Sequence, residues 1–353
     1  MRYSKVYLDA LGYELAPVVV SSAELEGRLE RTYKALHLQP GQLEAFTGIR
    51  ERRWWEPGFR LSEGAARAGR KALDAAGVKP SELGALIYGG VCRENFEPAT
   101  ACAVARALGV GAGAALFDLS NACLGVLNGI VDVANRIELG QIRAGLVVSC
   151  ESAREINEAT IERMAADAGL ASFKDSLATL TGGSGAVAAL LTDGSFGSKR
   201  RRLVGGAFRA APEHNGLCRW GLEPLPLHNG YKARKPVEEV MRTDAVAVLK
   251  NGVTLGRDCW REFLGAVGWT AAAVDKVVCH QVGRAHQDEI LAAFGVPPAK
   301  DFTTFEHLGN IGTVSLPLTA AVAEERDGLL PGDKVGFLGI GSGLNCLMLG
   351  WEW

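Results

Sequence analysis

The sequence lacks any run long and apolar enough to cross a membrane. A spanning helix needs about 20 mostly apolar residues, and the longest uncharged stretches, 176–192 and 335–351, have only 17 residues each and contain glycine, serine, threonine or asparagine. The first residues also lack the uninterrupted apolar core of a signal peptide. We therefore expect a soluble protein of the cytoplasm.

An excess of charge of one sign is also missing. The chain has 38 basic and 40 acidic residues, so its formal net charge is -2 and nothing attracts it as a whole to a nucleic-acid backbone. Because 48% of the residues are apolar, intrinsic disorder is excluded as well. The composition predicts a globular protein that does not bind nucleic acids.

The eight cysteines form no C-x-x-C or C-x-H pair. Those spacings are typical of zinc sites and of redox motifs, so neither is indicated. Most of the cysteines lie in apolar runs and are expected to be reduced core residues. We expect no metal and no other cofactor.

Glycine, in contrast, is abundant. The 353 residues include 44 glycines, well above the usual ~7%, with no repeat or linker to account for them. Such glycines mark turns and close approaches of the backbone. The length itself is typical of two domains.

The apolar pattern predicts an α/β protein built from two similar halves. In the first half, strands are expected at 83–90, 114–119, 144–150 and 185–192, and helices at 101–109 and 123–140. The second half repeats this order, with a strand at 274–280 and a helix ending at Phe294. Segment 301–305 then corresponds to the strand residues 116–119 of the first half. A further amphipathic helix is expected within 236–269. We place the halves at 1–195 and 196–353, joined by the charged segment 193–202, whose basic run 199–202 is interpreted as a solvated linker.

One charged segment, 151–175, has a helical pattern with few apolar positions. It could cover a pocket, or it could be a solvated surface helix. Both interpretations remain open from the sequence.

Cys123 differs from the other cysteines because it begins a helix directly after a strand. The positive end of the helix dipole favours the thiolate there, and hence a nucleophile. The alternative is a small buried apolar residue. His280 ends a strand in the second half, and Asn310 lies in the turn that corresponds to the Cys123 turn. A cysteine, a histidine and an asparagine at equivalent turns indicate nucleophilic catalysis.

These residues lie in motifs that resemble the thiolase superfamily, in particular its ketoacyl-synthase III branch, over nearly the whole chain. The matching segments are TGIRERR (47–53), FDLSNACLG (117–125), VCHQ (278–281), GNIGTVSLP (309–317) and GIGSGL (339–344). The resemblance implies a five-layered αβαβα thiolase fold, a homodimer, and Cys123 as the residue that accepts the acyl group. It also implies that His280 and Asn310 hold the thioester carbonyl of the second substrate, and that the N–H groups of Cys123 and Ser342 form an oxyanion hole.

Glu97 bears on the type of condensation. It lies 26 residues before Cys123, where the fatty-acid priming synthases usually have an apolar or aromatic residue. A non-decarboxylative Claisen condensation must remove a proton next to a thioester, and a carboxylate in an apolar site is a suitable base. The alternative is a glutamate that only stabilises a helix N-terminus. The motifs are most similar to the head-to-head acyl-CoA condensing enzymes of long-chain olefin and β-lactone biosynthesis, which implies that two fatty acyl-CoAs form a 2-alkyl-3-keto acid and that downstream lipid-pathway enzymes are partners.

The resemblance also suggests which residues bind the thioester carrier. The residues expected at the CoA are Arg50, Arg52, Arg53, Arg284 and Gly309. An acyl carrier protein is the alternative carrier. Two other functions stay open: a 3-oxoacyl-carrier-protein synthase III that decarboxylates a malonyl carrier, and a non-catalytic thiolase-fold subunit of a partner enzyme.

Overall fold

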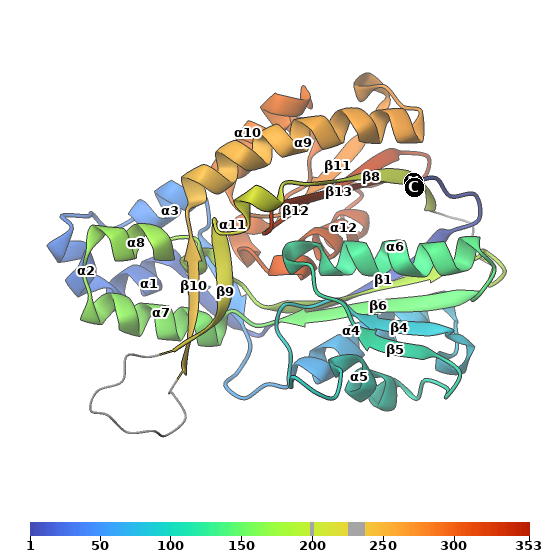
Figure 1. Ribbon diagram of the computed structural model, residues 1–353, viewed down its shortest axis with the longest axis horizontal. Helices are drawn as coiled ribbons and strands as arrows, with labels where there is room; N and C mark the ends of the chain where they lie inside the picture. Colours follow the sequence, from blue (N-terminus) through green and yellow to red (C-terminus); the bar gives the residue numbers. More distant parts are fainter. Residues whose placement is uncertain (198–200, 225–236) are drawn as a thin grey trace.

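The computed structural model describes residues 1–197, 201–224 and 237–353. Two layers of strands alternate with three layers of helices (Figure 1). The two central helices, α6 (Gly125–Glu138) and α12 (Ser315–Glu325), lie between the layers of strands. The outer layers are formed by α4 (Leu61–Ala76) with α5 (Thr100–Leu108), and by α9 (Ala245–Val267) with α10 (Arg284–Phe294). The predicted five-layered αβαβα fold is confirmed.

Nine strands follow one another in the order β11-β12-β13-β8-β1-β7-β6-β4-β5. A single residue pair, Tyr7 with Arg202, joins β1 to β8, so the order consists of two halves that meet at this point. The strands are β1 (Tyr7–Leu15), β4 (Ala85–Tyr88), β5 (Ala115–Asp118), β6 (Ala144–Glu151), β7 (Gly185–Thr192), β8 (Arg202–Ala210), β11 (Lys276–Cys279), β12 (Lys334–Gly341) and β13 (Asn345–Glu352).

The two halves share one topology over four strands each, and β5 adds a fifth strand to the first half. In the first, β4 pairs in parallel with β6, followed by antiparallel β7 and β1. In the second, β11 pairs in parallel with β12, followed by antiparallel β13 and β8. A one-turn helix precedes each central helix: η2 (Ala122–Leu124) before α6 and η7 (Gly312–Val314) before α12. The predicted duplication is therefore present, while the boundary at 195/196 stays a prediction.

The main core lies around the central helices. All eight residues of β6 and of β7 are buried, which explains their nearly uncharged sequences, since both faces of these strands are covered by helices. The predicted stripe of α6 faces the core through Leu127, Ile130 and Ile137. In α12, the nine residues 315–323 are all buried, so this helix has no solvated face.

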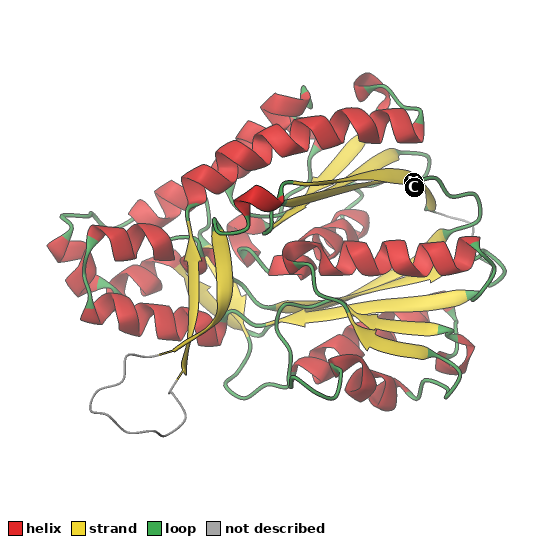
Figure 2. Cartoon of the chain, in the orientation of Figure 1, coloured by secondary structure: helices red, strands yellow, loops and turns green. Residues whose placement is uncertain are grey.

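A smaller lobe lies beside the layers and has its own apolar cluster (Figure 2). It includes the two-stranded sheet of β9 (Cys218–Pro224) and β10 (Val237–Thr243), and the pair β2 (Val18–Ser21) and β3 (Glu51–Trp54). Its helices are α1 (Ser22–Arg28), α2 (Glu30–Ala35), α3 (Gln42–Thr47), α7 (Arg154–Ala166) and α8 (Leu170–Ser176). Short helices complete the chain: η1 (Pro80–Glu82), η3 (Thr179–Thr181), η4 (Pro212–His214), η5 (Ala271–Ala273), η6 (Pro298–Lys300) and α11 (Phe305–Leu308).

Two expectations need correction. Segment 301–305 is not a strand: Asp301 forms only an isolated bridge with Val277, and α11 begins at Phe305. The basic run is not a solvated linker where it is described, because Arg201 pairs with Glu324 and bonds the carbonyl oxygens of Leu8 and Asp9, and because β8 begins at Arg202. Lys199 and Arg200 lie outside the described residues.

In the described part of the chain, no helix combines the length and the apolar character that a membrane crossing requires. No group of three or more histidine, cysteine or acidic residues in those ranges could hold a metal ion.

Candidate active site

A cavity of about 760 Å³ lies where the two halves meet the smaller lobe. Cys123, His280, Asn310 and Ser342 all line it. Apolar residues form most of its remaining wall. They come from α7, the residue after α8, the β9–β10 hairpin, the first turns of α9 and the β12–β13 turn: Ile156, Leu177, Trp220, Leu222, Val240, Met241, Val248, Leu249 and Leu344. Because Ile156 lines the cavity, segment 151–175 covers a pocket, which decides between the two interpretations left open by the sequence.

Cys123 is the middle residue of η2, directly before α6. Its neighbour Ala122 has a positive φ of 45°, a conformation that L-residues rarely adopt. Burial raises the pKa of the Cys123 thiol to about 12, and the thiol of Cys218 and the carboxylate of Glu151 act in the same direction. Burial thus acts against the thiolate that the helix dipole was expected to favour, so we expect the resting residue to be a thiol.

The turn between β12 and β13 lies against the backbone of Cys123. A Cβ atom on Gly341 would stand 3.4 Å from the Cys123 nitrogen, so this glycine permits the close approach. The side chain of Asn345 donates to Asn121 Oδ1 at 3.0 Å and thereby joins the same two segments. Ser342 follows Gly341 and lines the cavity, which is compatible with the predicted oxyanion hole.

His280 and Asn310 enter the cavity from the second half. Burial, with a smaller contribution from His286, lowers the pKa of His280 to about 3, so its imidazole is neutral at neutral pH. Asn310 is held by its backbone, which donates to Thr181 O and accepts from Gly183 N, both at 2.9 Å. Its Oδ1 accepts from Gly312 N at 3.0 Å, which leaves the side-chain NH₂ as a donor for a ligand.

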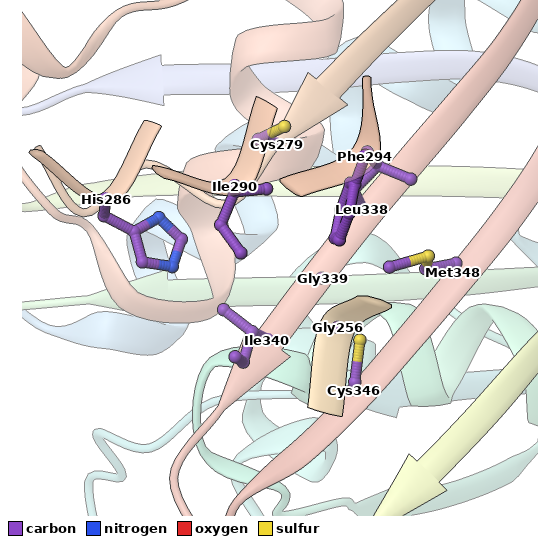
Figure 3. A pocket seen from close by; sticks show the side chains of 10 residues that line it. All are labelled: Gly256, Cys279, His286, Ile290, Phe294, Leu338, Gly339, Ile340, Cys346 and Met348. Atoms are coloured by element: carbon purple, nitrogen blue, oxygen red, sulfur yellow. The ribbon is translucent and has the colours of Figure 1, made fainter. Parts of the chain in front are cut away.

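His286, in the first turn of α10, lines the same cavity, and burial lowers its pKa to about 4. It also lines a second, much smaller cavity of about 10 Å³ between α9, α10 and β12. Figure 3 shows His286 at one end of this space and the apolar side chains of Phe294 and Met348 at the other. So small an apolar space has room for about one water molecule and no ligand.

Glu97 lies outside the cavity. It is exposed in the loop before α5, beside Phe96, whose side chain is 97% exposed. One chain by itself therefore does not bring Glu97 to Cys123.

Glu151, a buried residue whose carboxyl group lies in the cavity wall, was not among the residues predicted from the sequence. Its oxygens accept hydrogen bonds from the N–H groups of Val91 at 2.9 Å and Cys92 at 3.0 Å. Burial raises its pKa. An acidic residue at the end of an otherwise uncharged buried strand was the signal that could have found it.

None of the residues predicted to contact CoA lines the cavity. Arg52 is fully buried and donates to Val20 O at 3.3 Å and Ser22 Oγ at 3.1 Å, and Arg53 bonds Ala16 O at 3.4 Å. At Gly309, with φ of +67°, a Cβ atom would stand 2.5 Å from Thr181 O, so this glycine serves packing. The predicted CoA contacts of these three residues are not supported by the structure.

Arg50 and Arg284 are exposed instead. Arg50 pairs with Glu44 and Glu306. Arg284 lies over the ring of Phe305, between the cavity-lining residues Gly283 and Ala285. Their contact with CoA stays a prediction.

Among the described residues, Arg219 is the one arginine or lysine that lines the cavity. It is exposed on β9. No motif distinguishes it in the sequence, because its position follows only from the folding of the hairpin over the cavity.

The duplicated fold, with a cysteine turn and an asparagine turn at one cavity, defines a thiolase-superfamily condensing enzyme. Residues 57–184 match the family described as "Thiolase, N-terminal domain", and residues 264–353 match "3-Oxoacyl-[acyl-carrier-protein (ACP)] synthase III C terminal". The chain is 55% identical to an acyl-CoA:acyl-CoA alkyltransferase of Shewanella oneidensis and 35% identical to one of Xanthomonas campestris, over 100% of each pair of chains. The chain therefore belongs to the family of acyl-CoA:acyl-CoA alkyltransferases.

The solved structures agree with this assignment. A crystal structure of OleA from Xanthomonas campestris has a TM-score of 0.92 at 35% identity and covers 100% of this chain and 98% of that chain. Other OleA structures contain cerulenin, or lauric acid and lauroyl-CoA. The OleA variants include replacements of a cysteine and of a glutamate that stand 26 positions apart, the same separation as between Cys123 and Glu97.

Proposed function

We propose that this protein joins two fatty acyl-CoAs head to head by a non-decarboxylative Claisen condensation and releases a 2-alkyl-3-keto acid. The observation that carries the proposal is the convergence of Cys123, His280 and Asn310 on one large, mainly apolar cavity. Full-length similarity to two acyl-CoA:acyl-CoA alkyltransferases supports it.

The first step transfers an acyl group to Cys123. Neutral His280 accepts the thiol proton, sulfur attacks the thioester carbon, and the C–S bond to CoA breaks while CoA leaves as a thiol. The N–H groups of Cys123 and Ser342 stabilise the negative oxygen of the tetrahedral intermediate. The resting thiol, with its raised pKa, thus needs this proton transfer to become a nucleophile.

In the second step, a base removes a C2 proton from the second acyl-CoA. His280 and the NH₂ of Asn310 stabilise the enolate, which attacks the Cys123 thioester, so that a C–C bond forms and the cysteine C–S bond breaks. Hydrolysis of the remaining CoA thioester then frees the keto acid. In sum, two acyl-CoAs and one water give one keto acid and two CoA molecules.

We assign the base to Glu97, acting in the cavity of a second copy of the chain. Glu97 is exposed and lies outside the cavity of its own chain, and the resemblance implies a homodimer. Glu97 and Cys123 are 26 positions apart, and so are the glutamate and the cysteine that were replaced in OleA. This match supports the assignment.

Measuring free CoA and keto acid from myristoyl-CoA alone tests the reaction. We expect wild type to release CoA without a malonyl donor, Cys123→Ser to release none, and mass spectrometry to detect myristoyl on Cys123. Activity that requires a malonyl carrier would instead establish the decarboxylative synthase. A lack of any acylation would favour the non-catalytic subunit.

Co-expression of two inactive variants tests the position of the base. In a mixed dimer of Cys123→Ser and Glu97→Ala, a base acting across the dimer leaves one site intact, so random mixing restores about a quarter of wild-type activity. A base acting within its own chain restores none. Glu94→Ala is the matched control, because Glu94 lies in the same loop but is engaged by Ser62.

A further inference from the structure

The β9–β10 hairpin has a row of like charges next to the cavity. Arg219 on β9 stands directly opposite Arg242 on β10, so the two side chains extend from the same face. Like charges in this position destabilise a strand pair. Arg163 of α7 is also close, and burial together with the repulsion from Arg242 lowers its pKa.

Carboxylates compensate only part of this charge. Glu223 and Glu238 stand opposite each other across the two strands, four residues from the arginine pair. Glu223 Oε2 forms an ion pair with Arg242 at 3.3 Å. Arg219 has no ion pair or hydrogen bond within residues 1–197, 201–224 and 237–353. Glu223 also lines the cavity, but its ion pair is with Arg242, so the positive charge of Arg219 is the one not paired within the described residues.

From this arrangement we propose that Arg219, backed by Arg242 and Arg163, binds a phosphate of CoA during the reaction. The inference rests on the proposed function, in which phosphates are the strongest anionic groups of the substrate. A guanidinium binds phosphate through paired, charge-assisted hydrogen bonds. Since Arg219 and Cys123 line the same cavity, a thioester at the sulfur and its carrier's phosphate occupy one continuous space.

The test compares octanoyl-CoA with octanoyl-N-acetylcysteamine, which has the same acyl thioester but no phosphate. Loss of one charge-assisted phosphate contact in Arg219→Ala should raise KM for octanoyl-CoA about tenfold or more, with kcat little changed. The KM for the N-acetylcysteamine thioester should stay as in wild type. Arg219→Lys should recover part of the CoA affinity, and Arg209→Ala, which removes an exposed arginine paired with Glu262, should change neither value.

An unchanged KM for octanoyl-CoA in Arg219→Ala would overturn the inference. An equal rise with both substrates would also overturn it, because that result would show a change of cavity shape or a contact with the product carboxylate. If the wild-type enzyme reacts with neither octanoyl-CoA nor octanoyl-N-acetylcysteamine, the proposed function itself fails. The wild-type reaction alone reveals this outcome.

Discussion

The side-chain oxygen of Thr313 accepts a hydrogen bond of 2.7 Å from the backbone N–H of Val126. Thr313 lies in η7, three residues after Asn310, and Val126 is the second residue of α6, three residues after Cys123. This buried bond therefore links the cysteine turn of one half directly to the asparagine turn of the other. It fixes the relative position of Cys123 and Asn310, which in the proposed reaction hold the first acyl group and the enolate of the second substrate.

Thr313→Val should weaken this link. The substitution leaves the buried N–H of Val126 without its acceptor, which costs about 1–3 kcal/mol. We expect a lower Tm and a larger loss of condensation than of Cys123 acylation, measured by calorimetry and by mass spectrometry. Thr254→Val, at an exposed threonine that bonds Lys250 O within α9, should change neither; equal effects of the two substitutions would contradict the link.

The reactivity of Cys123 should rise with pH well beyond neutrality. Burial raises its pKa to about 12, so the thiolate fraction, and the rate of alkylation by iodoacetamide, should increase about tenfold per pH unit from pH 7 to 9.5. Peptide mass spectrometry separates this reaction from that of exposed Cys102. A plateau below pH 8 would show that the resting residue is a thiolate after all.

Glu151→Gln should affect both stability and the nucleophile. The amide can accept only one of the two hydrogen bonds from Val91 and Cys92, so unfolding should become easier by about 1–3 kcal/mol. Removal of the negative charge should lower the pKa of Cys123 and speed its alkylation at pH 9, since Glu151 contributes to the raised value. Glu155→Gln, which alters an exposed acid bonded to Ser152, is the control. An unchanged rate of Cys123 alkylation in Glu151→Gln would show that Glu151 does not influence the nucleophile.

Asp301 should make stability pH-dependent. Burial raises its pKa to about 7, so the folded chain holds a proton that the unfolded chain releases near its ordinary pKa of 3.8. Stability from this group is therefore greatest below pH 4 and is lost as pH rises to about 7. Asp301→Asn should show a smaller fall in Tm between pH 5 and 8 than wild type, whereas Asp258→Asn, at a half-buried aspartate paired with Arg261, should not. An identical fall in all three proteins would refute this.

The fold was largely predictable from the sequence because its strands and helices have clear local patterns. The buried strands near 144–150 and 185–192 and the repeated order of the halves all follow from apolar periodicity. Segment 301–305 was mispredicted as a strand. Its sequence does not reveal that it pairs with the neighbouring strand β11 through a single residue, Asp301.

The site was predictable only in part. Cys123, His280 and Asn310 stand at strand ends or turns, where motif and local structure coincide, and the cavity brings them together. Arg52 and Arg219 show where sequence-based prediction of the site fails, because the sequence does not distinguish a buried arginine from one that lines the cavity. Only tertiary packing decides that one is enclosed in the small lobe and that the other borders the cavity.

The burial of α12 on all sides also limits how the chain can be divided. Residues 315–323 contact both layers of strands, so separating the halves would expose an apolar helix that no solvated face protects. Each half would then lose the neighbour that completes its interior. The cavity thus depends on contact between the two halves, and we expect separately expressed halves to need each other in order to fold.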